Sequence, residues 1–179
     1  DWAEGRVIQI KLNSPLRVQP FCTHFGTCGG CQWQMLPYSQ QLFYKQKQVT
    51  DNLQRIGKVH LPPIQPIIGC DATTQYRNKM EYTFSNKRFV PDDVFRKMKA
   101  AGEDTDSAVF KDVGGFHAKG IFDKVVEIDE CFLQAEPTNL LRKAVAAFVK
   151  ENNLLFYDIK HKTGWLRNML VRMADTGEL

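Results

Sequence analysis

Three cysteines lie within ten residues of the sequence, and their spacing is typical of a metal centre. Cys22, Cys28 and Cys31 follow the pattern C-x5-C-x2-C, and Gly29 and Gly30 fill the shorter gap. Glycine takes positive φ without steric cost, so we expect this loop to fold back and direct three sulfurs at one point. Successive backbone N–H groups in such a turn also stabilise an anionic, sulfide-rich centre.

A fourth ligand must come from elsewhere in the chain. A cubane iron–sulfur cluster needs four thiolates, commonly a group from one loop and a distant fourth. Cys131 ends a strand-like run and is the preferred choice, whereas Cys70 lies in a Gly-Cys-Asp turn and is interpreted as a spare thiol. The sequence therefore predicts a [4Fe–4S] cluster held by Cys22, Cys28, Cys31 and Cys131.

Other uses of these thiols stay open. Structural zinc also prefers four cysteine ligands, although usually as two C-x2-C pairs, and only one such pair is present. Disulfides suit a secreted chain, but the five cysteines are an odd number and no signal peptide precedes them. A nucleophilic Cys131 with His117 as its base has little support once Cys131 is placed in the cluster. The common nucleotide-binding and hydrolase motifs are absent from the sequence.

The composition fits a globular domain with an unevenly placed positive charge. The 179 residues suffice for one full core, and no apolar run is long enough to span a bilayer. The net charge is +4, and residues 138–172 carry seven Lys or Arg against two acids. Such asymmetry suits a basic face turned toward a polyanion, and a merely solvated surface is the alternative.

The first third of the chain reads as a short β segment followed by a helix. Residues 6–11 and a second run ending at Val18 are expected strands, interpreted as the remnant of a small β-domain over residues 1–20. Residues 39–56 predict a helix that ends at Gly57 and packs one apolar stripe into a core. That stripe comprises Leu42, Val49, Leu53 and Ile56. A short strand is expected at 67–68.

The middle of the chain predicts strands with a basic surface. Residues 76–85 alternate at period two, which places Arg77 and Lys79 side by side on the polar face. Residues 90–107 are interpreted as an inserted excursion with a short helix at 94–100. Strands at 109–113 and 122–128 then bracket a hairpin tip that exposes Phe116, His117 and Lys119. These three residues are candidates for stacking on a base and holding a phosphate, and the alternative is that Phe116 folds back into the core.

The last third predicts one more helix and two strands. Pro137 fits the start of an amphipathic helix over 138–151 that packs through Leu141, Val145 and Phe148. Strands are expected at 155–159 and 165–173, and the chain then stops in half a hairpin around Asp175, which suggests truncation. The predicted fold is α+β, with a mainly antiparallel sheet, two main helices and the cysteine loop at one edge.

The motifs taken together resemble a known family. The cysteine loop, the helix after it, the Tyr-Arg-Asn-Lys-Met-Glu-Tyr run, the Gly-Phe-His segment leading to Cys131, and Leu-Arg-Asn at 166–168 are similar to the RNA 5-methyluridine methyltransferases. The likeness is to the iron–sulfur branch that acts on 23S ribosomal RNA, and it runs over nearly the whole chain. Two features depart from the family: the length of the 90–107 excursion, and Phe132, where proline is frequent.

The resemblance implies a fragment of a larger enzyme. Residues 1–20 would end a TRAM domain, residues 21–179 would form the central iron–sulfur and RNA-binding domain, and the C-terminal S-adenosylmethionine domain would be absent. The catalytic cysteine that adds to C6 of uracil would belong to that missing domain, so the fragment is expected to be inactive. The central domain would hold the RNA while the target base is flipped out, with the cluster as a structural element.

The expected setting follows from the same resemblance. The implied partner is ribosomal RNA, and the protein is expected to be a cytoplasmic monomer without membrane contact. In the purified fragment the cluster is expected to be open to loss or to replacement by zinc. The alternative class is a self-standing zinc or iron–sulfur protein that binds RNA or transfers electrons.

Overall fold

The computed structural model describes residues 3–5, 7–104, 111–174 and 176–179, and the chain divides into two compact units. The first unit comprises Asp1–Phe21 and Trp33–Cys70, and the second comprises Cys22–Gln32 and Asp71–Leu179. The second unit contains the sheet and four of the five cysteines. In the described part of the chain, no helix combines the length and the apolar character that a membrane span requires.

The first unit contains the predicted helix. Helix α1 spans Tyr38–Asp51 and continues into a π-helical turn, η1, at Asn52–Ile56, which confirms the expected element. Its apolar stripe is not buried, however, since no residue of either segment is buried and Val49 remains 57% exposed. The helix also ends differently, because Gly57 stays right-handed at φ −71° and Lys58 takes the positive φ of 53°.

Two predicted β segments of this unit are wrong. The described residues 7–18 form turns and irregular chain, and residues 67–68 are irregular as well. A strand needs the backbone hydrogen bonds of a neighbouring strand, and neither segment has one among the described residues. Ile67 instead donates its N–H to the Gln46 side chain at 3.0 Å.

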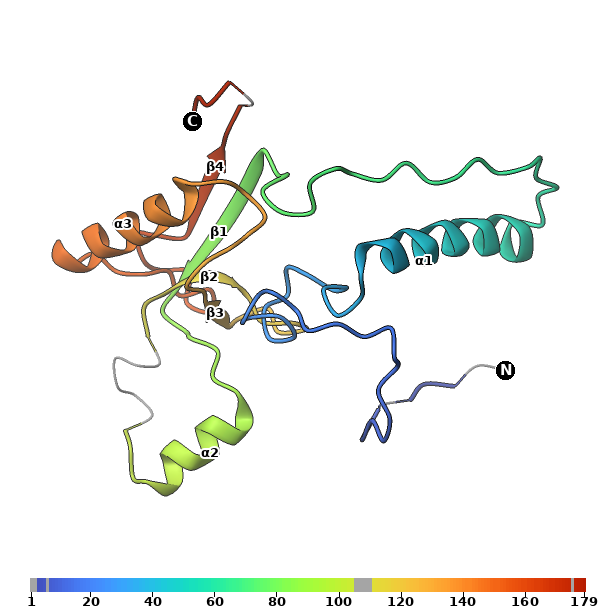
Figure 1. Cartoon of the computed structure of the whole chain (residues 1–179). Coiled ribbons are helices and arrows are strands. Elements are labelled where there is room, and N and C mark those ends of the chain that lie inside the picture. The colour runs from blue at the N-terminus through green and yellow to red at the C-terminus, as the bar shows by residue number, and fades with distance from the viewer. Residues whose placement is uncertain (1–2, 6, 105–110, 175) are drawn as a thin grey trace. The chain divides into compact units, whose positions relative to one another are not determined.

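The second unit is built on a four-stranded antiparallel sheet (Figure 1). Its order is β3-β2-β1-β4, and the strands are β1 (Lys79–Ser85), β2 (Val113–His117), β3 (Val125–Glu127) and β4 (Asn168–Arg172). The predicted α+β class with an antiparallel sheet is therefore confirmed. The short helix α2 (Asp92–Ala100) lies in the predicted excursion, which the chain makes between β1 and β2; residues 105–107 of the excursion lie outside the described residues.

One face of the sheet packs against helix α3, which spans the predicted Thr138–Glu151 (Figure 1). Met80, Tyr82 and Phe84 alternate toward this core, as expected from period two. The helix does not bury the face that the sequence predicted, because Leu141 and Phe148 are exposed. Its buried side chains are Thr138, Asn139, Arg142 and Val149. The polar members Thr138, Asn139 and Arg142 make side-chain hydrogen bonds inside the unit, a feature that hydrophobic periodicity does not predict.

Several predicted boundaries are corrected by the structure. The first strand begins at Lys79, so Arg77 precedes it. Residues 155–159 form only isolated bridges, Phe156 with Leu166 and Asp158 with Thr163. The expected strand at 109–113 begins at Val113, and residues 109–110 lie outside the described part, as does Asp175 in the expected terminal turn.

Candidate metal centre and nucleic-acid interface

The cysteine loop, residues 22–32, is held against the turn that follows β2. Gly29 donates its N–H to the carbonyl of His117 at 3.0 Å, and Lys119 donates its own to the carbonyl of Thr27 at 3.1 Å. Cys28 forms an antiparallel bridge with Ala118 between these two contacts. Because these bonds involve the backbone, the position of Cys28 is fixed relative to the sheet.

The backbone conformation of the glycines in this loop differs from the prediction. The positive φ lies at Gly26 (91°), whereas Gly29 and Gly30 do not have it. Gly29 is needed for close approach, because a Cβ there would lie 2.9 Å from the carbonyl oxygen of His117. Gly30 points its N–H at the sulfur of Cys28 at 3.4 Å, and such N–H donors stabilise a thiolate.

The segment that carries Cys131 is fixed by side chains from two directions. Asn139, at the start of α3, accepts the N–H of Cys131 at 2.8 Å and donates to its carbonyl at 3.2 Å. Arg142 donates to the carbonyl of Asp129 at 3.1 Å. From the cysteine loop, Nε2 of His24 accepts the N–H of Asp129 at 3.0 Å. His24 thus ties the loop to the segment that carries the fourth cysteine.

All four predicted ligands belong to this unit. Burial chiefly raises the pKa of the Cys131 thiol above its usual value, and the nearby Cys31, Cys28 and Cys22 raise it further. The pKa of Cys28 is likewise raised by burial and by Cys31 and Cys22. Cys31 packs against the core cluster that contains Cys131. Cys70 is exposed and belongs to the first unit, where its N–H binds the hydroxyl of Tyr38 at 2.7 Å.

The donor set fits the predicted cluster in number and kind, since it offers four thiols. Within the described ranges, no three or more His, Cys, Asp or Glu side chains are grouped so that they could hold a metal ion. The centre therefore remains a proposal. Sequence reasoning missed His24 and Asn139; the only signal was the place of His24 inside the C-x5-C segment.

The sheet face opposite α3 is polar and carries a cationic pair. Lys79 and Arg172 are direct partners across β1 and β4, so their side chains share this face. Both residues are exposed. Sequence reasoning selected Lys79 and missed Arg172, although alternation along β4 would have placed Arg172 on the polar face. Arg77 is also exposed, and its N–H binds the carbonyl of Leu133 at 2.9 Å.

The other predicted RNA-binding residues are separated by the structure. Phe116 and His117 lie within β2, so the prediction that they form a hairpin tip is wrong. The Phe116 ring packs on Tyr82 with 5.2 Å between centroids and contacts the core, which favours the alternative interpretation of this residue. His117 points to the opposite, polar face, and Lys119 is exposed just beyond the strand.

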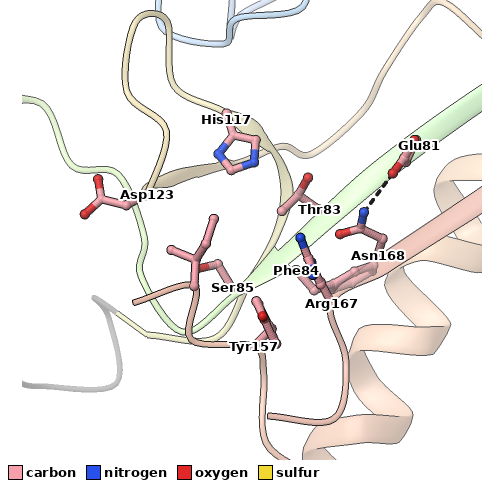
Figure 2. Close-up of a pocket in the computed structure, with 10 residues that line it drawn as sticks. Glu81, Thr83, Phe84, Ser85, His117, Asp123, Tyr157, Arg167 and Asn168 are labelled. Atoms are coloured by element: carbon pink, nitrogen blue, oxygen red, sulfur yellow. Dashed lines mark hydrogen bonds between the residues drawn. The ribbon is translucent and has the colours of Figure 1, made fainter. Parts of the chain in front are cut away.

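A pocket of about 250 Å³ lies on this polar face (Figure 2). Glu81, Thr83 and Ser85 of β1 line it together with His117 on one side and Asn168 on the other. The amide of Asn168 donates to Glu81 at 2.7 Å. The pocket also includes Asp123, whose pKa is lowered below its usual value chiefly by a hydrogen bond from Lys160.

Tyr157 also lines the pocket, and the residue that follows it, Asp158, is a buried carboxylate. The guanidinium of Arg167 lies over the Tyr157 ring, 4.8 Å from its centroid. The next residue, Asp158, accepts hydrogen bonds from Asn86 at 3.0 Å and from the backbone of Lys160 at 2.8 Å. The bond from Asn86, followed by the bonds from the side chain and backbone of His161, lowers the pKa of Asp158 well below its usual value. The carboxylate thereby anchors the chain beside Tyr157.

The comparisons define the kind of protein to which this chain is similar. No model of a known protein family matches it. It is 47% identical over 178 residues to an uncharacterized RNA methyltransferase of Bacteroides thetaiotaomicron, a match that covers 99% of this chain and 38% of the relative. It is 40% identical over 185 residues to an uncharacterized RNA methyltransferase of Porphyromonas gingivalis, covering 100% of this chain and 38% of that relative. Proteins named as RNA methyltransferases are thus its relatives, and the chain spans little more than a third of their length.

A solved structure supports the fold. The tRNA (uracil-54, C5)-methyltransferase of Pyrococcus abyssi, determined with S-adenosyl-L-homocysteine, superposes with a TM-score of 0.58 at 23% identity. The match covers 94% of this chain and 31% of that one. The described arrangement of helices and strands is therefore one that an RNA-modifying enzyme uses for part of its length.

Proposed function

We propose that this chain is the part of an S-adenosylmethionine-dependent RNA (uracil-5-)-methyltransferase that holds a [4Fe–4S] cluster and positions RNA. The observation that carries the proposal is that burial and the nearby Cys31, Cys28 and Cys22 raise the pKa of Cys131 within one unit of a chain whose relatives are named RNA methyltransferases. Methyl transfer and the binding of S-adenosylmethionine would belong to the remaining length of the enzyme, because the chain spans 38% of such a relative.

The cluster would act as a structural tie in this unit. When bound, it supplies four strong iron–thiolate bonds that join the cysteine loop to the segment before α3. The four thiols are half-buried or buried. Burial and the neighbouring cysteines raise the pKa of Cys28 and of Cys131, which favours the protonated form of these two thiols. The cysteines would hold iron as thiolates, so they would release protons on binding and the affinity would rise with pH.

The polar sheet face would hold the RNA. Lys79 and Arg172 lie opposite each other, and two like charges in such positions repel. A phosphate between them would remove that repulsion and release counterions. We further propose 23S ribosomal RNA as the target, and a cytoplasmic, monomeric enzyme, on the strength of the motif resemblance.

Anaerobic reconstitution with iron and sulfide tests the metal centre. The chain should bind about four irons and show broad visible absorbance from sulfur-to-iron charge transfer. Cys22→Ser, Cys28→Ser, Cys31→Ser and Cys131→Ser should each lower the iron content, and the matched control Cys70→Ser should leave it unchanged. Addition of a chelator should lower the Tm of the reconstituted protein.

Two results would contradict this assignment. Loss of iron in Cys70→Ser but not in Cys131→Ser would show that the fourth ligand is wrong. One zinc per chain in protein prepared without oxygen, with no iron uptake, would replace the cluster by a structural zinc site.

A further inference from the structure

The pocket on the polar sheet face has no role in the function proposed so far. We infer that it binds one unpaired nucleobase carrying an exocyclic amino group, cytosine being the simplest, and so anchors RNA beside the cationic pair. The RNA origin of this base rests on the proposed function. The pocket chemistry is independent of the cluster, because its lining comes from the sheet, Asp123 and residues 157–168 and includes none of the cysteines.

The pocket is rich in hydrogen-bond acceptors. An ionised carboxylate accepts only, so the Asn168 atom that faces Glu81 must be its NH₂ group, and the amide oxygen is left for a ligand. Figure 2 shows this oxygen on the pocket side of Asn168. Glu81 keeps acceptor capacity beyond its one bond to Asn168, and Thr83 adds a hydroxyl. A ligand that presents N–H donors therefore matches this part of the pocket.

The same chemistry selects among ligands. Two carboxylates, Glu81 and Asp123, line the pocket, and Asp123 is already paired with Lys160 at 3.0 Å, so Glu81 is the carboxylate available to a ligand. The amino groups of cytosine, adenine and guanine suit a carboxylate acceptor, whereas O4 of uracil would face it acceptor to acceptor. A base that carries an amino group thus matches the lining better than uracil.

The walls provide a stacking surface of suitable size. The Arg167 guanidinium lies over Tyr157 at cation–π distance, 4.8 Å from the ring centroid, and single-stranded bases stack on guanidinium planes. About 250 Å³ is below the range of about 300–1,000 Å³ that encloses drug-sized ligands, and it suits a single base. The buried Nδ1 of His117, another lining residue, has no hydrogen-bond partner among the described residues.

The site also continues toward the predicted phosphate contacts. Lys79, Glu81 and Thr83 are alternate residues of β1 and therefore share one face. Arg172 lies across from Lys79, and Asn168 lies across from Thr83. A base in the pocket would thus have cations two to four residues away along the same strands, where its flanking phosphates would lie.

Cytidine and uridine form a matched pair of probes, since they differ in the amino group. Titration of the full chain, followed by the amide NMR signals of Glu81, Thr83 and Asn168, should show cytidine binding about tenfold more tightly than uridine, as one good polar contact provides. Glu81→Gln should remove most of this preference, because an amide both donates and accepts. Glu103→Gln, an exposed carboxylate after α2, is the control and should leave it unchanged.

A second arm uses stem-loop RNAs with cytosine or uracil loops. Arg167→Ala should weaken binding of the cytosine loop by about tenfold, as expected for a lost stacking plane, without a change in Tm. If neither stem-loop binds the chain but cytidine shifts the pocket signals, the RNA-positioning proposal fails and the pocket assignment stands. If RNA binds equally well to wild type, Glu81→Gln and Arg167→Ala, and cytidine and uridine give equal or no shifts, the pocket assignment is overturned.

Discussion

At the residue scale, the position of Cys131 depends on side chains that are not themselves ligands. Asn139 binds both the N–H and the carbonyl of Cys131, and it also donates to Glu136 at 2.9 Å. Asn139 is only 4% exposed, so these bonds are made away from water. A buried polar network of this kind fixes one conformation when every member is satisfied.

Replacement of Asn139 by alanine tests this role. The substitution leaves the buried N–H of Cys131 without its acceptor, which costs about 1–3 kcal/mol. We expect a lower Tm and, after anaerobic reconstitution, a lower iron content. Asn152→Ala, at the exposed other end of α3, removes a hydrogen bond to the carbonyl of Phe148 and should leave the iron content unchanged. Wild-type iron content in Asn139→Ala would show that Cys131 does not need this anchor.

At the element scale, the cysteine loop is positioned by backbone pairing and not by its own turn. Its bonds to residues 117–119 extend the end of β2, and the contact between His24 and Asp129 closes the other side. Sequence reasoning found the cysteines because their spacing is local. It could not find His24, because its partner lies 105 residues away and no periodicity links the two.

The difference between local patterns and distant contacts also separates the helices and strands that were predicted correctly from those that were not. Residues 138–151 formed the predicted helix because the pattern there is local, and β1 alternates as expected. The hairpin tip was misplaced because Gly114 and Gly115 read as turn residues. In the structure Gly115 pairs with both Thr83 and Glu127, and a Cβ on Gly114 would lie 2.6 Å from the Phe84 ring. These glycines serve close packing, which a single sequence does not distinguish from a turn.

The glycine pair of the loop allows a matched test of the docking. Gly29→Ala would place a Cβ 2.9 Å from the His117 carbonyl, so the loop must shift, at a cost of about 1–3 kcal/mol. Gly30→Ala meets only the Cys28 sulfur at 3.5 Å, an ordinary contact. Thermal melts and iron content should therefore fall for Gly29→Ala and stay near wild type for Gly30→Ala. Equal behaviour of the two variants would mean that the docking at His117 does not position the ligands.

At the scale of the whole molecule, the second unit has two differently used sheet faces. One face packs on α3 and holds the core, including Cys131. The other face carries the Lys79–Arg172 pair and the acceptor-rich pocket. The net charge of +4 would give any polyanion a weak general attraction. The arrangement on the polar face instead predicts local contacts.

Salt dependence distinguishes local contacts from general attraction. Lys79→Ala and Arg172→Ala should each reduce the slope of log affinity against log salt for a stem-loop RNA by about one, and the double variant by about two. Lys150→Ala is the control, because its ammonium lies 5.7 Å from the Phe156 ring, on the α3 side of the sheet. Equal loss of slope in Lys150→Ala would indicate attraction by overall charge.

Lys79→Ala and Arg172→Ala, which should weaken RNA binding, should not lower the stability of the free protein. Lys79 and Arg172 repel each other in the absence of RNA, so replacing either should leave the Tm unchanged or slightly higher. If the pair stabilised the fold, replacing either residue would lower the Tm. Thermal melts of the free and RNA-bound forms of each variant make the comparison within one sample. A lower Tm in the free form, with an unchanged salt slope, would assign the pair to folding and remove it from the RNA interface.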